Sequence, residues 1–129
     1  MKTVVLVENN TESFLCGGQH GFSLYLETGG IKILFDAGQD ELFFINAKKL
    51  GVSIEDVDIM VLSHGHFDHG GGLSCFLEQN QKAKVYIHDL AFGDYYSRAS
   101  SPPRYIGLEQ SCKENARLVR NTGYLRIND

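Results

Sequence analysis

Runs of apolar residues divide the chain into short elements that predict a mixed α/β domain. Residues 22–28 alternate apolar and polar side chains, which is the period of a half-buried strand. Two glycines at 29–30 join this segment to the next apolar run, which predicts a hairpin. Runs rich in β-branched and aliphatic residues predict further strands at residues 3–8, 31–38, 58–63 and 84–88.

Two other segments have the pattern of helices. Residues 40–50 carry spaced apolar side chains and end at Gly51, and residues 72–80 predict a second helix. Further on, residues 116–120 resemble a strand and residues 124–129 the start of another. Because strands alternate with helices after residue 36, the sequence predicts one α/β domain spanning residues 1–129, with helices on at least one face of the sheet.

Composition argues against several classes of protein. The 129 residues carry a net charge of −4 without a basic stripe, which gives no support for a nucleic-acid or membrane-surface partner. No segment approaches the roughly 20 apolar residues of a transmembrane helix. The three cysteines form no C-x-x-C pair and are expected to be free thiols of a cytoplasmic protein: Cys16, Cys75 and Cys112.

The stretch LSHGHFDHGGG, residues 62–72 and here called the metal loop, gathers four potential metal ligands. Imidazole nitrogen and carboxylate oxygen suit Zn²⁺, Fe²⁺ or Mn²⁺. In a turn after a strand, His64 and His66 could hold one ion, and Asp68 and His69 a second. The glycines are expected to permit unusual φ values and to leave room for substrate and water. Two such ions can generate a hydroxide nucleophile at neutral pH, which predicts a hydrolase.

Two less specific readings of the metal loop are a surface loop without function and a purely structural metal site. Four potential ligands at this spacing beside a run of glycines rarely arise in an ordinary surface loop. Structural zinc sites are commonly built around thiolates, which the loop lacks. We therefore favour the catalytic interpretation.

The metal loop resembles the H-x-H-x-D-H signature of the metallo-β-lactamase superfamily, and ILFDAG at residues 33–38 resembles the strand-end pattern that precedes it. The closer resemblance is to metal-dependent hydrolases of superfamily II, the dihydropterin ribofuranosylaminobenzene 5′-phosphate synthase-like proteins. It implies one half of an αββα sandwich, with a mixed sheet and helices on one face. It also implies hydrolysis of a small-molecule substrate by metal-bound hydroxide, with divalent metal, above all Zn²⁺, as cofactor.

The resemblance assigns roles to five residues. His64 and His66 would bind the first ion, and Asp68 and His69 the second. Asp68 is also the candidate catalytic residue, because it would orient the attacking water. Asp36 matches the strand-end Asp and would support the metal ligands from behind. A simple turn or cap residue is the alternative for Asp36.

Several residues outside the metal loop could reach the site. His20 precedes a predicted strand and His88 ends one, so either could lie at the edge of the site or contact substrate; an ordinary strand-end position is the alternative. Tyr95, Tyr96 and Arg104 could contact an anionic substrate, although packing of a long loop is the interpretation we favour.

The resemblance also implies that something is missing. Nothing after His69 matches the third His, the bridging carboxylate and the final His of the family's second half. The chain is therefore expected to be an N-terminal half whose uncovered sheet face requires a partner, either a second copy or a C-terminal half. The alternative function is a non-catalytic, self-associating half-domain that binds metal weakly or not at all.

Overall fold

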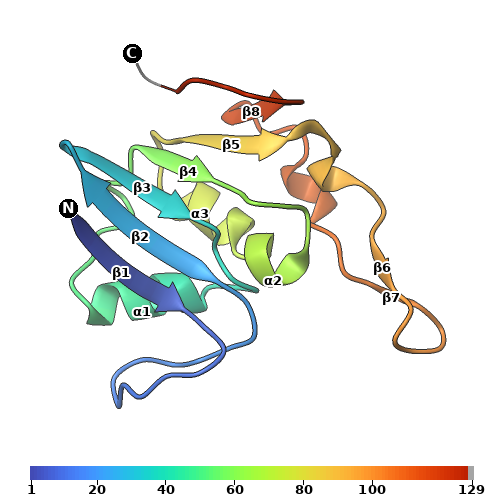
Figure 1. Ribbon diagram of the computed structural model, residues 1–129, viewed down its shortest axis with the longest axis horizontal. Coiled ribbons are helices and arrows are strands. Elements are labelled where there is room, and N and C mark those ends of the chain that lie inside the picture. Colours follow the sequence, from blue (N-terminus) through green and yellow to red (C-terminus); the bar gives the residue numbers. More distant parts are fainter. Residues whose placement is uncertain (128–129) are drawn as a thin grey trace.

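The computed structural model describes residues 1–127 and contains one six-stranded sheet (Figure 1). The strand order is β1-β2-β3-β4-β5-β8. The first three strands pair antiparallel, and the pairs from β3 to β8 are parallel, so the sheet is mixed. The strands are β1 (Lys2–Val7), β2 (Ser23–Thr28), β3 (Ile31–Phe35), β4 (Ile59–Val61), β5 (Lys84–His88) and β8 (Leu118–Asn121).

Three α-helices and several smaller elements connect these strands. The α-helices are α1 (Leu42–Lys49), α2 (Phe67–Gly70) and α3 (Leu73–Gln79). The smaller elements are the 3₁₀ turns η1 (Asp89–Phe92) and η2 (Gln110–Cys112) and the two-stranded hairpin of β6 (Tyr96–Ser97) and β7 (Arg104–Tyr105). In the part of the chain described, no helix is long and apolar enough to cross a bilayer.

The helices gather on one side of the sheet because of the order of the parallel strands (Figure 1). The chain passes from β3 to β4, β5 and β8 in one direction across the sheet. Parallel crossovers are right-handed, so successive crossovers in one direction place their connections on the same face. The prediction of a mixed sheet with helices on one face is confirmed.

The core forms between the helices and this covered face. One cross-strand row of the sheet is nearly inaccessible: Tyr25, Leu34, Met60 and Val85 are each 3% exposed or less. Helical side chains pack on the row, namely Phe43 and Ala47 of α1 and Leu73, Phe76 and Leu77 of α3. The alternation of side chains along each strand therefore commits one face to the core.

The opposite face of the sheet carries apolar side chains that no helix covers. One row of neighbours runs through Leu24, Phe35, Val61, Tyr86 and Val119, all of which are partly exposed. A second row runs through Leu26, Ile33 and Ile59, which are also partly exposed. We call these two rows the open sheet face.

The predicted elements agree with the structure except at two places. Residues 124–127 form no strand, so that prediction is wrong for them, and residues 128–129 lie outside the described residues. The metal loop contains the four-residue helix α2, where only a turn was expected. A helix this short leaves no periodic pattern in the sequence.

Candidate metal centre

The candidate site lies at the edge of the sheet where β3 and β4 end (Figure 1). β3 leads directly into Asp36, and β4 leads into the metal loop. The two segments meet again further on, where the Ala37 N–H donates to the His69 carbonyl oxygen at 2.7 Å. Parallel strands bring their carboxyl ends to the same edge, which is where ligand sites of α/β sheets form.

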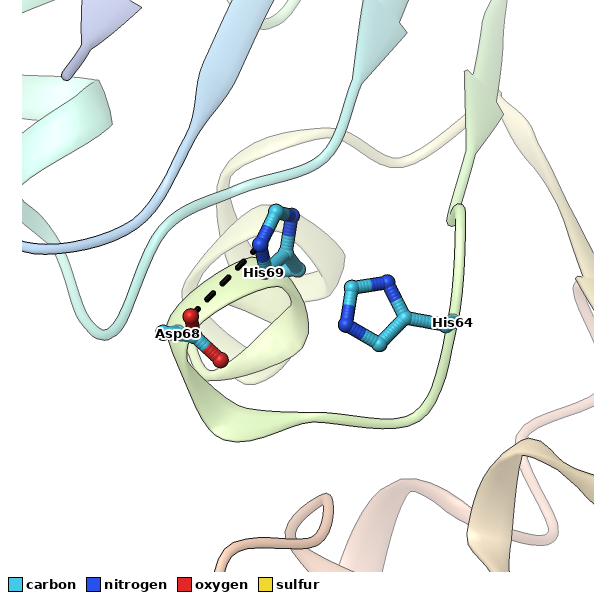
Figure 2. Close-up of side chains that lie close together, drawn as sticks. All are labelled: His64, Asp68 and His69. Carbon is cyan, nitrogen blue, oxygen red and sulfur yellow. Dashed lines mark ion pairs between the residues drawn. The ribbon is translucent and has the colours of Figure 1, made fainter.

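Three side chains of the metal loop converge at this edge. Figure 2 shows His64 extending from the loop after β4 toward Asp68 and His69, which come from α2. One potential ligand atom of each residue lies within 4.8 Å of those of the others. The Oδ2 atom of Asp68 is 3.5 Å from Nε2 of His69. Two imidazoles and a carboxylate at this separation form a donor set that fits one divalent transition metal ion.

Asp36 fixes this group from the interior of the protein. Its side chain is 1% exposed. Its Oδ1 accepts from the Ser63 N–H at 2.8 Å, while its Oδ2 accepts from the Ser63 hydroxyl at 2.7 Å and from Nδ1 of His69 at 2.8 Å. Its φ angle of 57° lies in the left-handed region, which Asp tolerates better than most residues. The carboxylate therefore holds Ser63 and His69 in place, while its role behind metal ligands stays a prediction.

The hydrogen bonds also determine which nitrogen each imidazole presents. The Ser63 hydroxyl donates its hydrogen to Asp36. Its oxygen can therefore only accept from Nδ1 of His64, which lies 2.9 Å away. Nδ1 of His69 donates to the same carboxylate. In both rings the proton is therefore on Nδ1, and the lone pair of Nε2 is available to a metal.

The electrostatic environment further favours the neutral form of His64. Partial burial lowers the pKa of this imidazole below its ordinary value of 6.5, and the neighbouring His69 and His66 lower it further. The carboxylates of Asp36 and Asp68 oppose this effect without reversing it. Because only the neutral imidazole binds metal, these neighbours extend metal binding toward lower pH.

His66 lies beside this group but does not belong to it. It precedes α2 as the N-cap residue, and its ring centroid is 4.7 Å from that of His64 and 5.6 Å from that of Tyr95. The structure thus brings His64 together with Asp68 and His69, whereas the sequence paired it with His66. The distribution of the four ligands over two ions stays a prediction.

The two histidines outside the metal loop differ in position. His20 is 69% exposed, and its Nε2 lies 3.2 Å from Oδ2 of Asp68, which places it at the edge of the site. His88 is exposed, and its Nδ1 accepts from the Leu90 N–H at 3.1 Å, which caps η1. This contact fits the alternative that His88 occupies an ordinary strand-end position.

Gly65 and Gly71 of the metal loop are required for close packing rather than for unusual φ angles. Neither Gly65 nor Gly71 has a positive φ. A Cβ at Gly65 would overlap the carbonyl oxygen of Ala91, and one at Gly71 would overlap that of Gln39. The expectation of unusual φ values and open space is wrong at these positions. They are small because neighbouring backbone occupies the space of a side chain.

Of the aromatic and basic residues after β5, Tyr95 and Tyr96 make packing contacts, and Arg104 lies near the site. Tyr96 packs edge-on against Tyr105, and the Tyr95 hydroxyl donates to the Leu90 carbonyl oxygen at 2.7 Å. Arg104 lies over the ring of Phe67, directly before Asp68. Ser63 hydrogen-bonds to Asp36 but was not selected from the sequence, although its position between β4 and His64 is a usable signal.

Comparison with known proteins identifies the family of this arrangement. The family model described as the metallo-beta-lactamase superfamily matches residues 16–121, a range that includes Asp36 and the whole metal loop. The chain belongs to the metallo-β-lactamase superfamily. The predicted relationship is therefore confirmed, and so is the fold expected for a half of the metallo-β-lactamase sandwich.

Three known proteins show what the chain is similar to along its length. An uncharacterized protein of Methanocaldococcus jannaschii is 39% identical over 112 residues, which are 85% of this chain and 41% of the relative. From the same organism, 7,8-dihydropterin-6-methyl-4-(beta-D-ribofuranosyl)-aminobenzene-5′-phosphate synthase is 39% identical over 80 residues, 57% of this chain and 27% of that protein. The crystal structure of a metal-dependent hydrolase of the β-lactamase superfamily has a TM-score of 0.70 at 27% identity, covering 98% of this chain and 43% of that one.

The chain thus spans less than half the length of each of these relatives. The matched portion nevertheless contains the strand ends and the metal loop described above. The similarity to the dihydropterin-related synthase agrees with the branch that the sequence predicted.

Proposed function

We propose that this protein contributes to a metal-dependent hydrolase that acts on a small-molecule substrate. The observation that carries the proposal is the group of His64, Asp68 and His69. Asp36 orients its two imidazoles, His69 directly and His64 through Ser63, so that both Nε2 atoms are available. If Asp36 served only to stabilise the fold, there would be no reason for two imidazoles to point toward the same place. The similarity to a metal-dependent hydrolase of the same superfamily supports the assignment.

Each residue has a proposed role that follows from its contacts. His64, Asp68 and His69 would hold a divalent ion, with His66 as the further ligand that the family signature implies. The ion would supply Lewis acidity toward the bond under attack and toward water. Asp68 is the proposed catalytic residue, because its carboxylate can accept a hydrogen bond from the attacking water and orient it. His20 can position that carboxylate from the solvent side.

We further propose Zn²⁺ as the metal, two ions in the complete site, and a cytoplasmic location. Imidazole and carboxylate ligands suit Zn²⁺, with Fe²⁺ and Mn²⁺ as the alternatives to be compared directly. The location is supported by the free thiols of Cys16, Cys75 and Cys112.

The test is metal content followed by turnover. The purified chain is loaded with Zn²⁺, Mn²⁺ or Fe²⁺, its bound metal is measured by mass spectrometry, and hydrolysis of p-nitrophenyl phosphate and p-nitrophenyl acetate is followed. We expect metal-dependent turnover that His64→Ala abolishes and His88→Gln preserves. Absence of metal-dependent turnover, with and without a chain supplying the rest of the fold, would refute the proposal.

A second candidate function is a non-catalytic half-domain that self-associates. The open sheet face favours it, because contiguous apolar side chains on a β-sheet are rarely left in water. We propose that a partner covers this face, and a second copy of this chain is the partner that the purified protein can supply itself. Native mass spectrometry would show a dimer with little bound metal if this candidate is correct. A monomer that retains two metal ions would contradict it.

A further inference from the structure

A pocket of about 430 Å³ opens beside the candidate metal centre. Its walls come from two parts of the chain that are distant in sequence. Three lining residues belong to the metal centre or its edge, namely His20, His66 and Asp68. Four belong to the hairpin of β6 and β7 and its turn, namely Ser97, Ala99, Ser100 and Arg104. Figure 1 shows the hairpin projecting from the body of the protein on the side where α2 lies.

Backbone hydrogen bonds hold the hairpin side of the pocket in register with the metal loop. The Phe67 N–H donates to the Ile106 carbonyl oxygen at 2.9 Å. The Ile106 N–H in turn donates to the Tyr95 carbonyl oxygen at 2.8 Å. The first residue of α2 is thereby tied to both ends of the hairpin, so the pocket has a defined geometry relative to Asp68.

Arg104 brings an available positive charge to this pocket. Its guanidinium carbon lies 5.0 Å from the centroid of the Phe67 ring, and stacking on an aromatic face pre-orients the planar group. Among residues 1–127, no carboxylate lies within ion-pair distance of Arg104. Its donors therefore remain free for a ligand.

A second donor lies on the same hairpin. The Ser97 oxygen accepts from the Ala99 N–H at 3.2 Å, so the hydroxyl hydrogen is free to donate elsewhere. The Ser100 hydroxyl, by contrast, donates to the Pro102 carbonyl oxygen at 3.2 Å. The hairpin wall thus presents a planar guanidinium and one hydroxyl as donors.

We propose that this pocket binds a phosphate group of the substrate and that Arg104 is its specificity-determining residue. The proposal rests on the proposed hydrolase function, because it places the phosphate next to the reacting group at Asp68. A guanidinium can give two parallel N–H bonds to phosphate oxygens, and a hydroxyl can serve another oxygen of the same group. A carboxylate carries a smaller negative charge than phosphate and has only two oxygens, so it is expected to bind the same donors more weakly.

The test measures binding of inorganic phosphate to the 129-residue chain, with and without one equivalent of Zn²⁺. The side-chain Nε–H signal of Arg104 is followed by NMR, since it reports contact with the guanidinium rather than with a metal. Arg104→Gln is compared with wild type and with Arg98→Gln, a matched control on the same hairpin that does not line the pocket. Acetate is titrated in parallel.

We expect the Arg104 signal to shift on addition of phosphate. We also expect Arg104→Gln to weaken phosphate binding by about tenfold or more, as the loss of a charge-assisted bidentate contact predicts. Arg98→Gln should bind as wild type does, and acetate should bind more weakly. Equal phosphate affinity in Arg104→Gln, an unmoved Arg104 signal, or acetate binding as tight as phosphate would each overturn the inference.

These outcomes are separable from failure of the proposed function. If neither p-nitrophenyl ester is hydrolysed in a metal-dependent way, with and without a chain supplying the rest of the fold, the hydrolase proposal fails while the Arg104 titration still reports on the pocket. If turnover occurs, Arg104→Gln should raise KM for p-nitrophenyl phosphate and leave KM for p-nitrophenyl acetate unchanged. An equal change for both esters would count against the role of Arg104.

Discussion

Asp36 is the residue on which the candidate metal centre most depends. It is buried, yet its two oxygens accept hydrogen bonds from the Ser63 backbone, the Ser63 hydroxyl and His69. Through Ser63 it also acts on His64. A single carboxylate thus sets the orientation of both imidazoles before any ion binds, which reduces the ordering that metal binding requires.

We therefore predict that Asp36→Asn weakens Zn²⁺ binding by about 10- to 100-fold, the range found when a group supporting a metal ligand is removed. The amide nitrogen of Asn cannot accept from Nδ1 of His69 or from the Ser63 hydroxyl. Competition with a chromophoric chelator would measure the affinity. Asp56→Asn is the control, because Asp56 is 58% exposed and, within residues 1–127, forms an ion pair with Lys32 alone. Equal affinities of the two variants would argue against the role of Asp36.

His64 provides a prediction about pH. Its imidazole should titrate below 6.5 in the metal-free protein, because partial burial and the neighbouring His69 and His66 lower its pKa. Since the folded value lies below the unfolded one, His64 contributes stability above about pH 6.5, and this contribution is lost as the pH falls through the folded pKa. NMR titration of the ring protons would measure the shift.

His66→Gln should raise the pKa of His64, because it removes one neighbour that becomes positively charged in acid. His88→Gln, which alters a histidine engaged with the Leu90 N–H, should leave it unchanged. An unaltered His64 midpoint in His66→Gln would show that the charge of His66 does not contribute to the shift.

At the scale of elements, the strands were predictable and the metal-loop helix was not. β5 has the predicted bounds, and β1 to β4 differ from their predicted bounds only at the ends. These strands were predictable because each is a continuous or alternating apolar run. By contrast, α2 is held by contacts with distant segments, such as the bond from the Phe67 N–H to Ile106. Local patterns do not record such contacts.

The connections between elements depend on buried side-chain amides, of which Asn80 is an example. It is fully buried and follows α3. Its amide donates to the carbonyl oxygens of Ile54 and Val57 at 2.9 and 2.8 Å, and its Oδ1 accepts from the backbone of Lys82 and Ala83 at 3.0 and 2.7 Å. It thereby joins the segment before β4 to the segment before β5.

Asn80→Ala should therefore lower the free energy of unfolding by about 2–4 kcal/mol, because several buried backbone groups would lose their partner. Chemical denaturation monitored by circular dichroism would measure the change. Asn10→Ala, at an exposed position, is the control and should be nearly neutral. A loss below about 0.5 kcal/mol for Asn80→Ala would mean that water replaces the amide.

At the scale of the whole molecule, the two faces of the sheet are unequal. One face is sealed by α1 and α3, while the open sheet face presents two apolar rows. The relatives are longer than this chain, which spans 41% of one and 43% of another. A partner on the open sheet face would both bury these rows and lie next to the strand ends that carry the candidate metal ligands.

We predict that Ile33→Lys, in the open sheet face, weakens self-association of the purified chain by at least about tenfold, because it buries a charge in an apolar contact. Sedimentation velocity over a concentration series would measure it. Ile45→Lys is the control, since Ile45 is 39% exposed on α1. A monomeric wild-type chain, or an equal effect of both variants, would contradict a role of this face in association.

The sequence by itself determined the strands of the main sheet, the two longer helices and the family, and it supplied the candidate metal ligands. Apolar periodicity and the spacing of the metal loop are local properties, so they can be found without coordinates. The tertiary structure decided which ligands meet, through bonds between Asp36, Ser63 and His69 that span 27 and 33 positions. It also decided that the glycines serve close packing and that Arg104 faces the site, because both depend on segments brought together only by the fold.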